Sequence, residues 1–197
     1  MKKTKLFAVL LVLLLGSTLS AKSFDWSECW CNYGAGVEEG DFIINVDTGL
    51  YYTDMVYRQY DNFWFVPPVV VDVQYAKKIW KLPFTFGGYA GIHGYGFEYD
   101  HWDNVDYRWE KRATSSWGLF VGAEAAYHVK MPVEILDLYV ASKMGFNIPF
   151  SKPDAYWVSD YFHFDEAIGA NFFFTKNVGL NVEIGYPFTK VGVAIKF

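Results

Sequence analysis

Two histidines have neighbours of the types that acid–base or nucleophilic chemistry uses. They are His101, beside Asp100 and Asp103, and His163, near Ser159 and Asp160. Such groups could supply an acid, a base and a nucleophile. Their spacing matches no catalytic motif, and no two histidines stand at ligand spacing within one element, as a metal site would need. The sequence therefore predicts no enzymatic activity, no cofactor and no metal, with these histidines in loops or in the interior.

Two cysteines, Cys29 and Cys31, are separated by one residue. An oxidising compartment would allow a disulfide, but so small a ring is strained, so any bond would be labile or would join two molecules. A lipid-anchor signal needs a small residue just before its cysteine, and neither Glu28 nor Trp30 is small. Lipidation is not expected.

A third group combines acids, bases and amides. Its members are Glu124, His128, Asp137, Lys143, Asn171, Asn181, Glu183 and Lys190. Because buried ionic groups need partners, one interpretation is a salt-bridged plug inside a narrow barrel. The alternative is a polar path that conducts ions or small solutes. Both interpretations require strands that turn these side chains to one face.

The apolar residues indicate such strands, because beyond about residue 40 they recur at every second position in blocks of about ten. No sustained helical period occurs. The blocks cover 42–52, 69–76, 84–93, 117–128, 136–143, 162–174, 178–186 and 191–197. Each has one apolar face and one small or polar face, although Glu166 interrupts the apolar face of the sixth block. The sequence predicts eight antiparallel strands.

The predicted connections alternate in length. Segments 77–82, 130–135 and 175–177 are short, whereas 53–68, 98–116 and 146–161 are longer and rich in charge, proline and aromatic residues. The last outer connection, around Pro187 and Phe188, is short. Outer-membrane barrels have short periplasmic turns and longer outer loops, so this alternation predicts which end faces outward.

Three hairpins can be paired without a conflict between faces. The expected opposite pairs are Ile184 with Val191, Val182 with Val193, Leu180 with Ile195, His128 with Asp137, and Asn171 with Asn181. Glu124 would lie diagonal to Lys143, and Glu183 diagonal to Lys190.

The first residues are typical of a secretory signal. Three lysines precede an apolar run over 6–15, and small or polar residues over 16–21 suit cleavage after Ala21. Cleavage would remove three lysines and no acid, so the formal charge would fall from -5 to -8. Nucleic acid is not an expected partner, because phosphate contacts need a basic surface. We predict a signal peptide at 1–21, a periplasmic segment at 22–40 and one barrel domain at 41–197.

Composition decides which face meets lipid. Apolar residues make up 52% of the chain and aromatic residues 21%. An eight-stranded barrel has an interior only wide enough for side chains to fill, and the large apolar side chains would overfill it. The apolar face therefore points to lipid and the small or ionic face inward. The predicted fold is all-β, an eight-stranded antiparallel transmembrane up-and-down β-barrel.

The last strand ends in an alternating apolar pattern formed by Val191, Val193, Ile195 and the terminal Phe197. It resembles the C-terminal assembly signal of bacterial outer-membrane proteins. In size and topology the chain resembles the small eight-stranded OmpA-, OmpX- and OmpW-type barrels. The resemblance implies a cell outer membrane with extracellular loops and periplasmic termini. It also implies outer-membrane lipid and the barrel-assembly machinery as partners. An outer-membrane lipid acyltransferase of this size is a known family, but it shares only residue types with this chain.

The outer segments are enriched in the residue types that dominate binding interfaces. These are Tyr57, Arg58, Trp64, Trp102, Tyr107, Arg108, Trp109, Arg112 and Trp157. The leading hypothesis is a non-enzymatic anchor whose loops contact an external partner. The alternative, which the OmpW-type resemblance implies, is a narrow transporter for small apolar or amphipathic molecules, with prolines near the outer rim opening a lateral gap.

Overall fold

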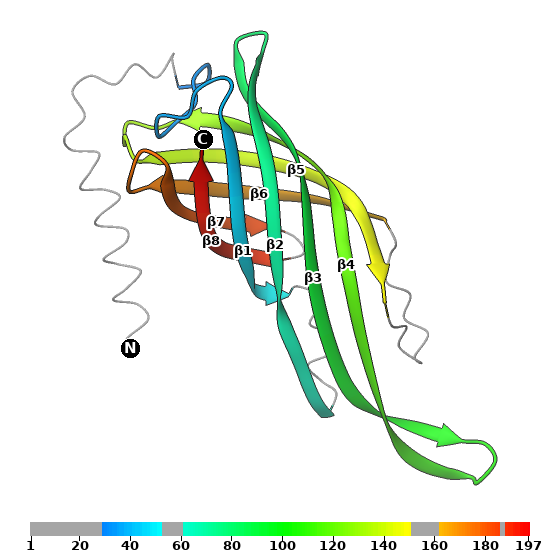
Figure 1. Ribbon diagram of the computed structural model, residues 1–197. Coiled ribbons are helices and arrows are strands. Elements are labelled where there is room, and N and C mark those ends of the chain that lie inside the picture. Colours follow the sequence, from blue (N-terminus) through cyan, green and yellow to red (C-terminus); the bar gives the residue numbers. More distant parts are fainter. Residues whose placement is uncertain (1–28, 53–60, 151–161, 186–187) are drawn as a thin grey trace.

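The computed structural model is a closed ring of eight antiparallel strands, each paired with its sequence neighbour and the last with the first (Figure 1). It describes residues 29–52, 61–150, 162–185 and 188–197. The strands are β1 (Phe42–Tyr52), β2 (Asp61–Ile79), β3 (Leu82–Asp103), β4 (Arg108–Lys130), β5 (Leu136–Pro149), β6 (Phe162–Phe173), β7 (Val178–Gly185) and β8 (Phe188–Lys196). The prediction of an eight-stranded, up-and-down all-β barrel is confirmed.

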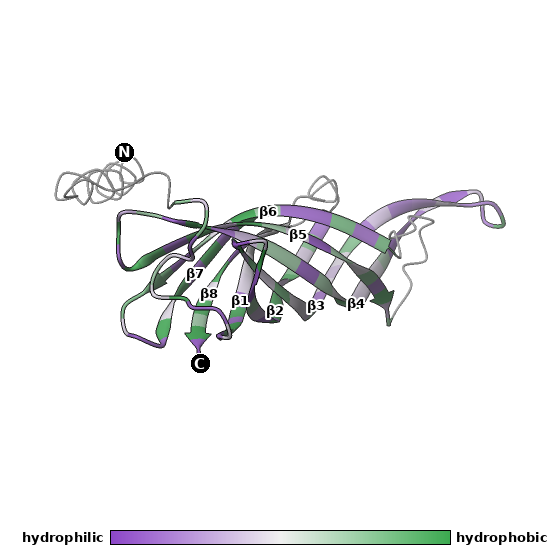
Figure 2. Ribbon diagram, turned by 90° about the horizontal axis from the view of Figure 1, so that it is seen from above, coloured by the Kyte–Doolittle hydropathy of each residue, from purple (hydrophilic) through white to green (hydrophobic). Residues whose placement is uncertain are grey.

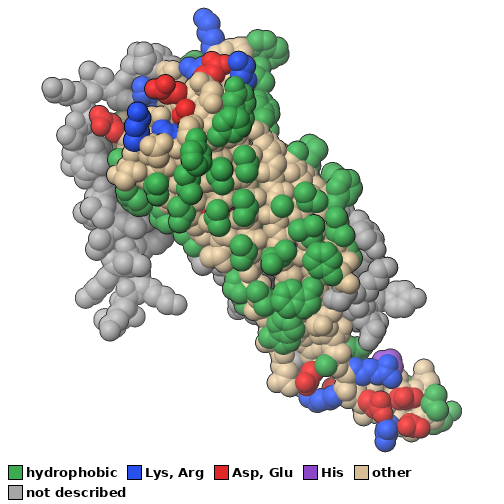
Figure 3. Space-filling view, in the orientation of Figure 1, with side chains coloured by type: hydrophobic (Ala, Val, Ile, Leu, Met, Phe, Trp, Pro, Cys, Tyr) green, Lys and Arg blue, Asp and Glu red, His purple; other side chains and the backbone are tan. Residues whose placement is uncertain are grey.

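Apolar side chains cover the outside of the barrel. Val69, Val71 and Val73 are 41–46% exposed, whereas Asp72 and Gln74, which alternate with them, are buried. Val193 is likewise exposed on the outer face. Residue hydropathy alternates along the strands in Figure 2, and Figure 3 shows apolar side chains over one wall with charged ones gathered at its two ends. An apolar outside around a polar interior is the arrangement of a transmembrane β-barrel.

No helix in the described part of the chain is long and apolar enough to cross a membrane.

Small residues make room for large ones inside the barrel. The buried Tyr139 ring of β5 lies over Gly169 of β6, where an added Cβ would come within 2.0 Å of the ring. Gly122 of β4 makes the same room for the Tyr89 hydroxyl, at 2.6 Å. In this narrow interior, glycines therefore make room for the Tyr139 and Tyr89 side chains.

The strands differ greatly in length. β3 and β4 have 22 and 23 residues, whereas β7 and β8 on the other side of the ring have 8 and 9. The prediction of a loop over 98–116 is wrong, because β3 and β4 remain paired as far as Asp103 opposite Arg108. A cross-strand pair of indoles, Trp102 and Trp109 with ring centroids 5.4 Å apart, supports this outer part. The β3–β4 hairpin beyond Phe97 and Thr114 thus extends past the rest of the barrel (Figure 1).

Two other expected loops also begin or end within strands. β2 starts at Asp61 and includes Pro67 and Pro68, which were expected to lie in the loop over 53–68. Its register with β3 shifts between Val66 and Val69, because proline has no amide hydrogen to give the ladder. β5 continues to Pro149, so the expected loop over 146–161 begins later.

The register of two hairpins differs from the prediction by two residues. Val182 pairs with Val191, and Glu183 lies directly opposite Lys190. Glu124 lies directly opposite Lys143, so His128 is diagonal to Asp137. A slip of two keeps every side chain on its face, so alternation alone could not detect it. The third prediction, Asn171 opposite Asn181, is confirmed.

Candidate functional site

The interior polar network crosses the middle of the barrel. We define it as the eight residues predicted from the sequence, Glu124, His128, Asp137, Lys143, Asn171, Asn181, Glu183 and Lys190, together with Asp47, Asp72 and Tyr139. All are at most 6% exposed. They project inward from seven of the strands, β1, β2 and β4 to β8, so their contacts join opposite walls.

Two lysines hold the carboxylates of the network. Lys143 Nζ lies 2.8 Å from both carboxylate oxygens of Glu183 and 3.2 Å from Glu124 Oε2. Lys190 Nζ lies 3.0 Å from Glu183 Oε1, and 3.5 and 3.8 Å from carboxylate oxygens of Asp47 and Asp72. Glu183 therefore bridges both ammonium groups, as buried charges require.

Hydrogen bonds extend the network toward the end of the barrel that holds the C-terminus. The Tyr139 hydroxyl donates to Glu183 at 3.2 Å, and the Asn181 amide is hydrogen-bonded to Tyr139 at 2.8 Å. Asn171 donates to Asp137, whose Oδ2 lies 2.9 Å from His128 Nδ1. The predicted residues are thus brought into one connected group.

Sequence reasoning missed three members of the network. Asp47, Asp72 and Tyr139 are buried and face the interior from β1, β2 and β5. No local sequence pattern indicates that β1 and β2 lie near Lys190 of β8, because their proximity depends on closure of the ring. The missing information was the pairing of β1 with β8.

A row of aromatic rings runs from the hairpin into the interior. It consists of His101, Tyr99, Phe97, Tyr95, His93, Phe120, Tyr89 and His163, with successive ring centroids 5.9–6.5 Å apart. The Tyr89 hydroxyl lies 2.6 Å from His163 Nε2, and Lys143 Nζ lies 5.8 Å from the Tyr89 ring centroid. The interior is therefore aromatic toward the hairpin end of the barrel and ionic in the middle.

An N-terminal cap, residues 29–41, closes the end of the barrel opposite the hairpin. Tyr33 and Val37 of the cap pack with Ile43, Ala76 and other buried residues. The Tyr33 hydroxyl donates to the Phe84 carbonyl at 2.8 Å, and burial raises the pKa of Tyr33 to about 12. Gly34 N donates to Asp137, so the cap also contacts the interior polar network.

Exposed aromatic and basic residues mark the β3–β4 hairpin. Tyr107 and Trp109 are 76% and 68% exposed. Trp102, Arg108, Trp109 and Arg112 were predicted to lie in a loop, but they lie within β3 and β4. Trp64, also predicted to lie in a loop, is in β2 and packs against Trp117 with ring centroids 6.0 Å apart. Tyr57, Arg58 and Trp157 lie outside the described residues.

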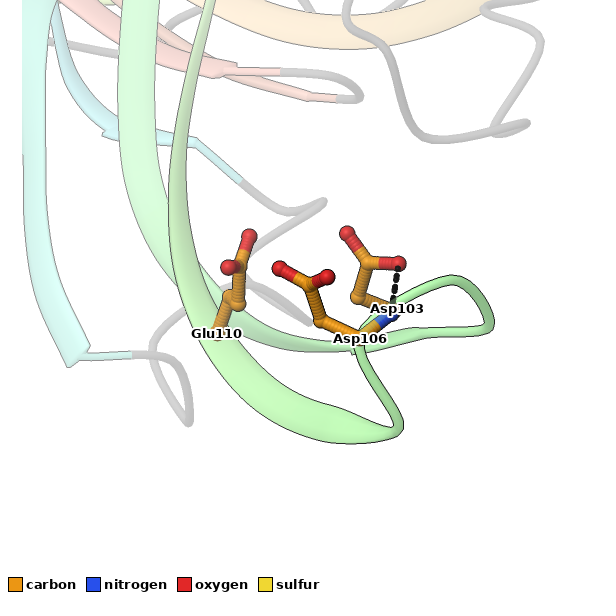
Figure 4. A group of neighbouring side chains, drawn as sticks. All are labelled: Asp103, Asp106 and Glu110. Carbon is orange, nitrogen blue, oxygen red and sulfur yellow. Dashed lines mark hydrogen bonds between the residues drawn. The ribbon is translucent and has the colours of Figure 1, made fainter.

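Three carboxylates meet at the hairpin tip (Figure 4): those of Asp103, Asp106 and Glu110, with oxygens within 4.8 Å of one another. Asp103 Oδ1 accepts hydrogen bonds from the amides of Val105 and Asp106. Arg108 Nη2 lies 2.7 Å from Glu110 and 3.3 Å from Asp106. Turn formation and this arginine account for the group, and we assign it no ion.

The remaining predicted residues have structural positions. His101 lies on β3 in the aromatic row, and His163 lies 3.5 Å from Asp165 in the interior. Ser159 and Asp160 lie outside the described residues. Both cysteines are free; the Cys29 thiol donates to the Lys130 carbonyl, and burial raises its pKa.

The C-terminal residues complete the ring. Val191, Val193 and Ile195 lie on β8 opposite Thr48, Val46 and Ile44 of β1, and Phe197 exchanges backbone hydrogen bonds with Phe42.

No family model matches the chain, and no curated protein matches it. Among solved structures the chain is similar to one described as "De novo design of transmembrane beta-barrels", with 22% sequence identity and a TM-score of 0.43. The match covers 82% of this chain and 98% of that one.

Proposed function

We propose that the chain is a non-enzymatic outer-membrane protein whose barrel anchors the β3–β4 hairpin outside the cell for contact with an external partner. The hairpin is the observation that carries this proposal. β3 and β4 remain paired through Asp103 and Arg108, whereas β7 ends at Gly185 and β8 begins at Phe188. A long, paired projection from one side of a barrel presents side chains in a fixed arrangement.

The chemistry of the tip supports recognition. Trp102, Tyr107 and Trp109 are at least 38% exposed, and Arg108 and Arg112 lie beside them. Trp, Tyr and Arg are the types that dominate binding hot spots. Because the two indoles already pack against each other, a partner would meet a preorganised surface.

Three features favour the outer membrane. The first residues resemble a secretory signal, and the alternation that ends in Phe197 resembles the outer-membrane assembly signal. The cap and the C-terminus lie at one end of the barrel, with the hairpin at the other (Figure 1), as in barrels with periplasmic termini. The intact barrel should resist SDS at room temperature and change its migration on boiling.

The interior favours anchorage over conduction. Lys143 and Lys190 connect carboxylates from several walls, and the cap packs into the end that holds the C-terminus. Such pairing across the interior supports a role as an anchor.

Shortening the hairpin tests the proposal. Glu98 and Ala113 are strand partners, so residues 99–112 can be replaced by an Asn-Gly turn. We expect the barrel to fold, as judged by heat-modifiable migration, while cells that display it lose adhesion to a panel of immobilised proteins and glycans. The matched control is Trp80→Ala, which removes an indole that is 92% exposed at the opposite end. Adhesion that survives hairpin shortening would contradict the proposal.

A narrow transporter for small apolar or amphipathic molecules is the second candidate. The aromatic row and the short strands β7 and β8 favour a transporter. Together they would line a route from the interior to the membrane. Uptake of an amphipathic dye by vesicles containing the refolded chain tests it. Transport should change on Glu124→Gln or Lys143→Met, and its absence in the unaltered chain would rule it out.

A further inference from the structure

One carboxyl lies on the lipid-facing wall. Glu166 of β6 is exposed, and Phe164 and Ile168, its neighbours on the same face, are 54% and 65% exposed. The other outward-facing ionisable side chains in the described part of the chain lie near the cap, as Lys77 does, or on the hairpin, as Glu98 does. Glu166 is therefore an exception within the apolar band.

This carboxyl has no ion-pair or hydrogen-bond partner among the described residues. An ionisable group within a membrane is costly and usually marks a functional contact. Its partner in the sheet register is Ser142 of β5, which is also exposed on the outer face. An unsatisfied acceptor and a hydroxyl donor thus lie side by side on neighbouring strands.

We propose that this wall, which we call the β5–β6 face, is the interface with a second copy of this chain. In the pair, Glu166 of each copy accepts a hydrogen bond from Ser142 of the other. A two-fold axis along the membrane normal that passes between β5 and β6 exchanges the two positions, so each acceptor meets a donor. Such an isologous contact needs one self-complementary patch, and this outward pair supplies it.

The apolar side chains around Glu166 suit a packed contact. Val140, Met144, Phe164 and Ile168 of the β5–β6 face are 52–65% exposed, compared with 41–46% for Val69, Val71 and Val73 of β2. Side chains that protrude further leave more surface for a neighbouring barrel. Since lipid tails are as apolar as these side chains, packing and hydrogen bonds must provide the specificity.

Disulfide capture tests this interface. The full mature chain, carrying Cys29→Ser and Cys31→Ser, receives Met144→Cys beside the proposed axis and is refolded into phosphatidylcholine vesicles. We expect oxidation to yield a covalent dimer. The matched control is Val71→Cys on β2, which is 41% exposed, compared with 52% for Met144, and lies on another wall. Equal capture at both positions would show random collision and overturn the proposal.

Substitution of the polar pair provides the second measurement. Glu166→Leu should lower the captured fraction at dilute protein in lipid. It should also lower the association constant about ninefold, if two hydrogen bonds each contribute roughly threefold. Ser142→Ala should act in the same direction, whereas Glu166→Gln keeps an acceptor and should retain the dimer. Heat-modifiable migration checks that each variant folds. Unchanged association in Glu166→Leu, or capture of a different protein in cell membranes in place of a second copy, would refute the inference.

Discussion

The interior polar network and the β3–β4 hairpin use the same ionic residue types in opposite surroundings. Lys143 is 6% exposed and contacts Glu183, a partner 40 residues away on another wall. Arg108 on the hairpin has a 65% exposed side chain and contacts Glu110, two residues away. The interior pairs tie the ring together, whereas the hairpin pairs order only the hairpin.

This difference separates the residues that stabilise the barrel from those of the proposed binding surface. A buried charge that loses its partner is left in a medium that cannot solvate it, whereas an exposed one returns to water. The barrel should therefore tolerate changes on the hairpin and few changes in the network. A surface that can change without unfolding its support is consistent with the proposed contact with an external partner.

Removing one charge in each region gives the largest expected contrast. Lys143→Met leaves Glu183 and Glu124 without their shared ammonium, and should lower the free energy of unfolding by about 3–5 kcal/mol. Arg108→Met should change it by less than about 1 kcal/mol. Urea unfolding in vesicles, followed by tryptophan fluorescence, measures both. Similar losses in the two variants would contradict the comparison.

A change in side-chain volume tests the contrast between the interior and the hairpin without altering any charge. Gly169→Ala places a methyl group against the Tyr139 ring, and overpacking of this kind should cost about 1–3 kcal/mol. Ala113→Val, on the exposed outer face of the hairpin, should stay within about 0.5 kcal/mol. The unfolding midpoints of the two variants test this contrast. An unchanged midpoint in Gly169→Ala would show that the interior can relax around the added methyl group.

The sequence predicts the faces of the strands well and their partners less well. Alternation identified Glu124, Lys143 and Asn171 as inward residues, because a strand turns every second side chain to the same side. It could not set the register, since a slip of two residues, as at Glu183 and Lys190, preserves every face. Contacts across the interior depend on ring closure, which no local pattern encodes.

Sequence analysis did not foresee how the cap packs, and it was wrong about the outer parts of β3 and β4. The cap is irregular, and its buried Tyr33 has no periodic neighbours to indicate packing. The outer parts of β3 and β4 contain many charges, such as Asp100 and Lys111, which indicate a loop by composition. In the structure, strand pairing through Trp102 and Trp109 overrides that composition.

A third prediction compares local order in the hairpin with the global stability of the barrel. Trp102→Ala removes the edge-to-face indole pair with Trp109, which should contribute about 0.5–1.5 kcal/mol. We expect faster amide hydrogen exchange over 99–112 with no change in global unfolding. Trp80→Ala, at the opposite end, should leave exchange in the hairpin unchanged. Global destabilisation by Trp102→Ala would show that the hairpin is not an independent unit.

The cap supplies the smallest expected effect and a pH dependence. Lys77 Nζ lies 2.7 Å from Glu39, and this hydrogen bond lowers the pKa of Glu39 below its ordinary value of 4.5. The bond favours the ionised carboxylate in the folded chain. Its stabilisation is therefore fully present above about pH 4.5 and is lost as the pH falls through the lowered pKa. Because both side chains are largely exposed, the effect should be slight.

Urea unfolding measured from pH 7 to pH 3 tests this expectation. The unaltered chain should be slightly more stable than Glu39→Gln at pH 7, and this difference in the free energy of unfolding should disappear toward the acidic end. An advantage that grew on acidification would contradict this prediction, because it would show that the folded chain favours the protonated carboxyl.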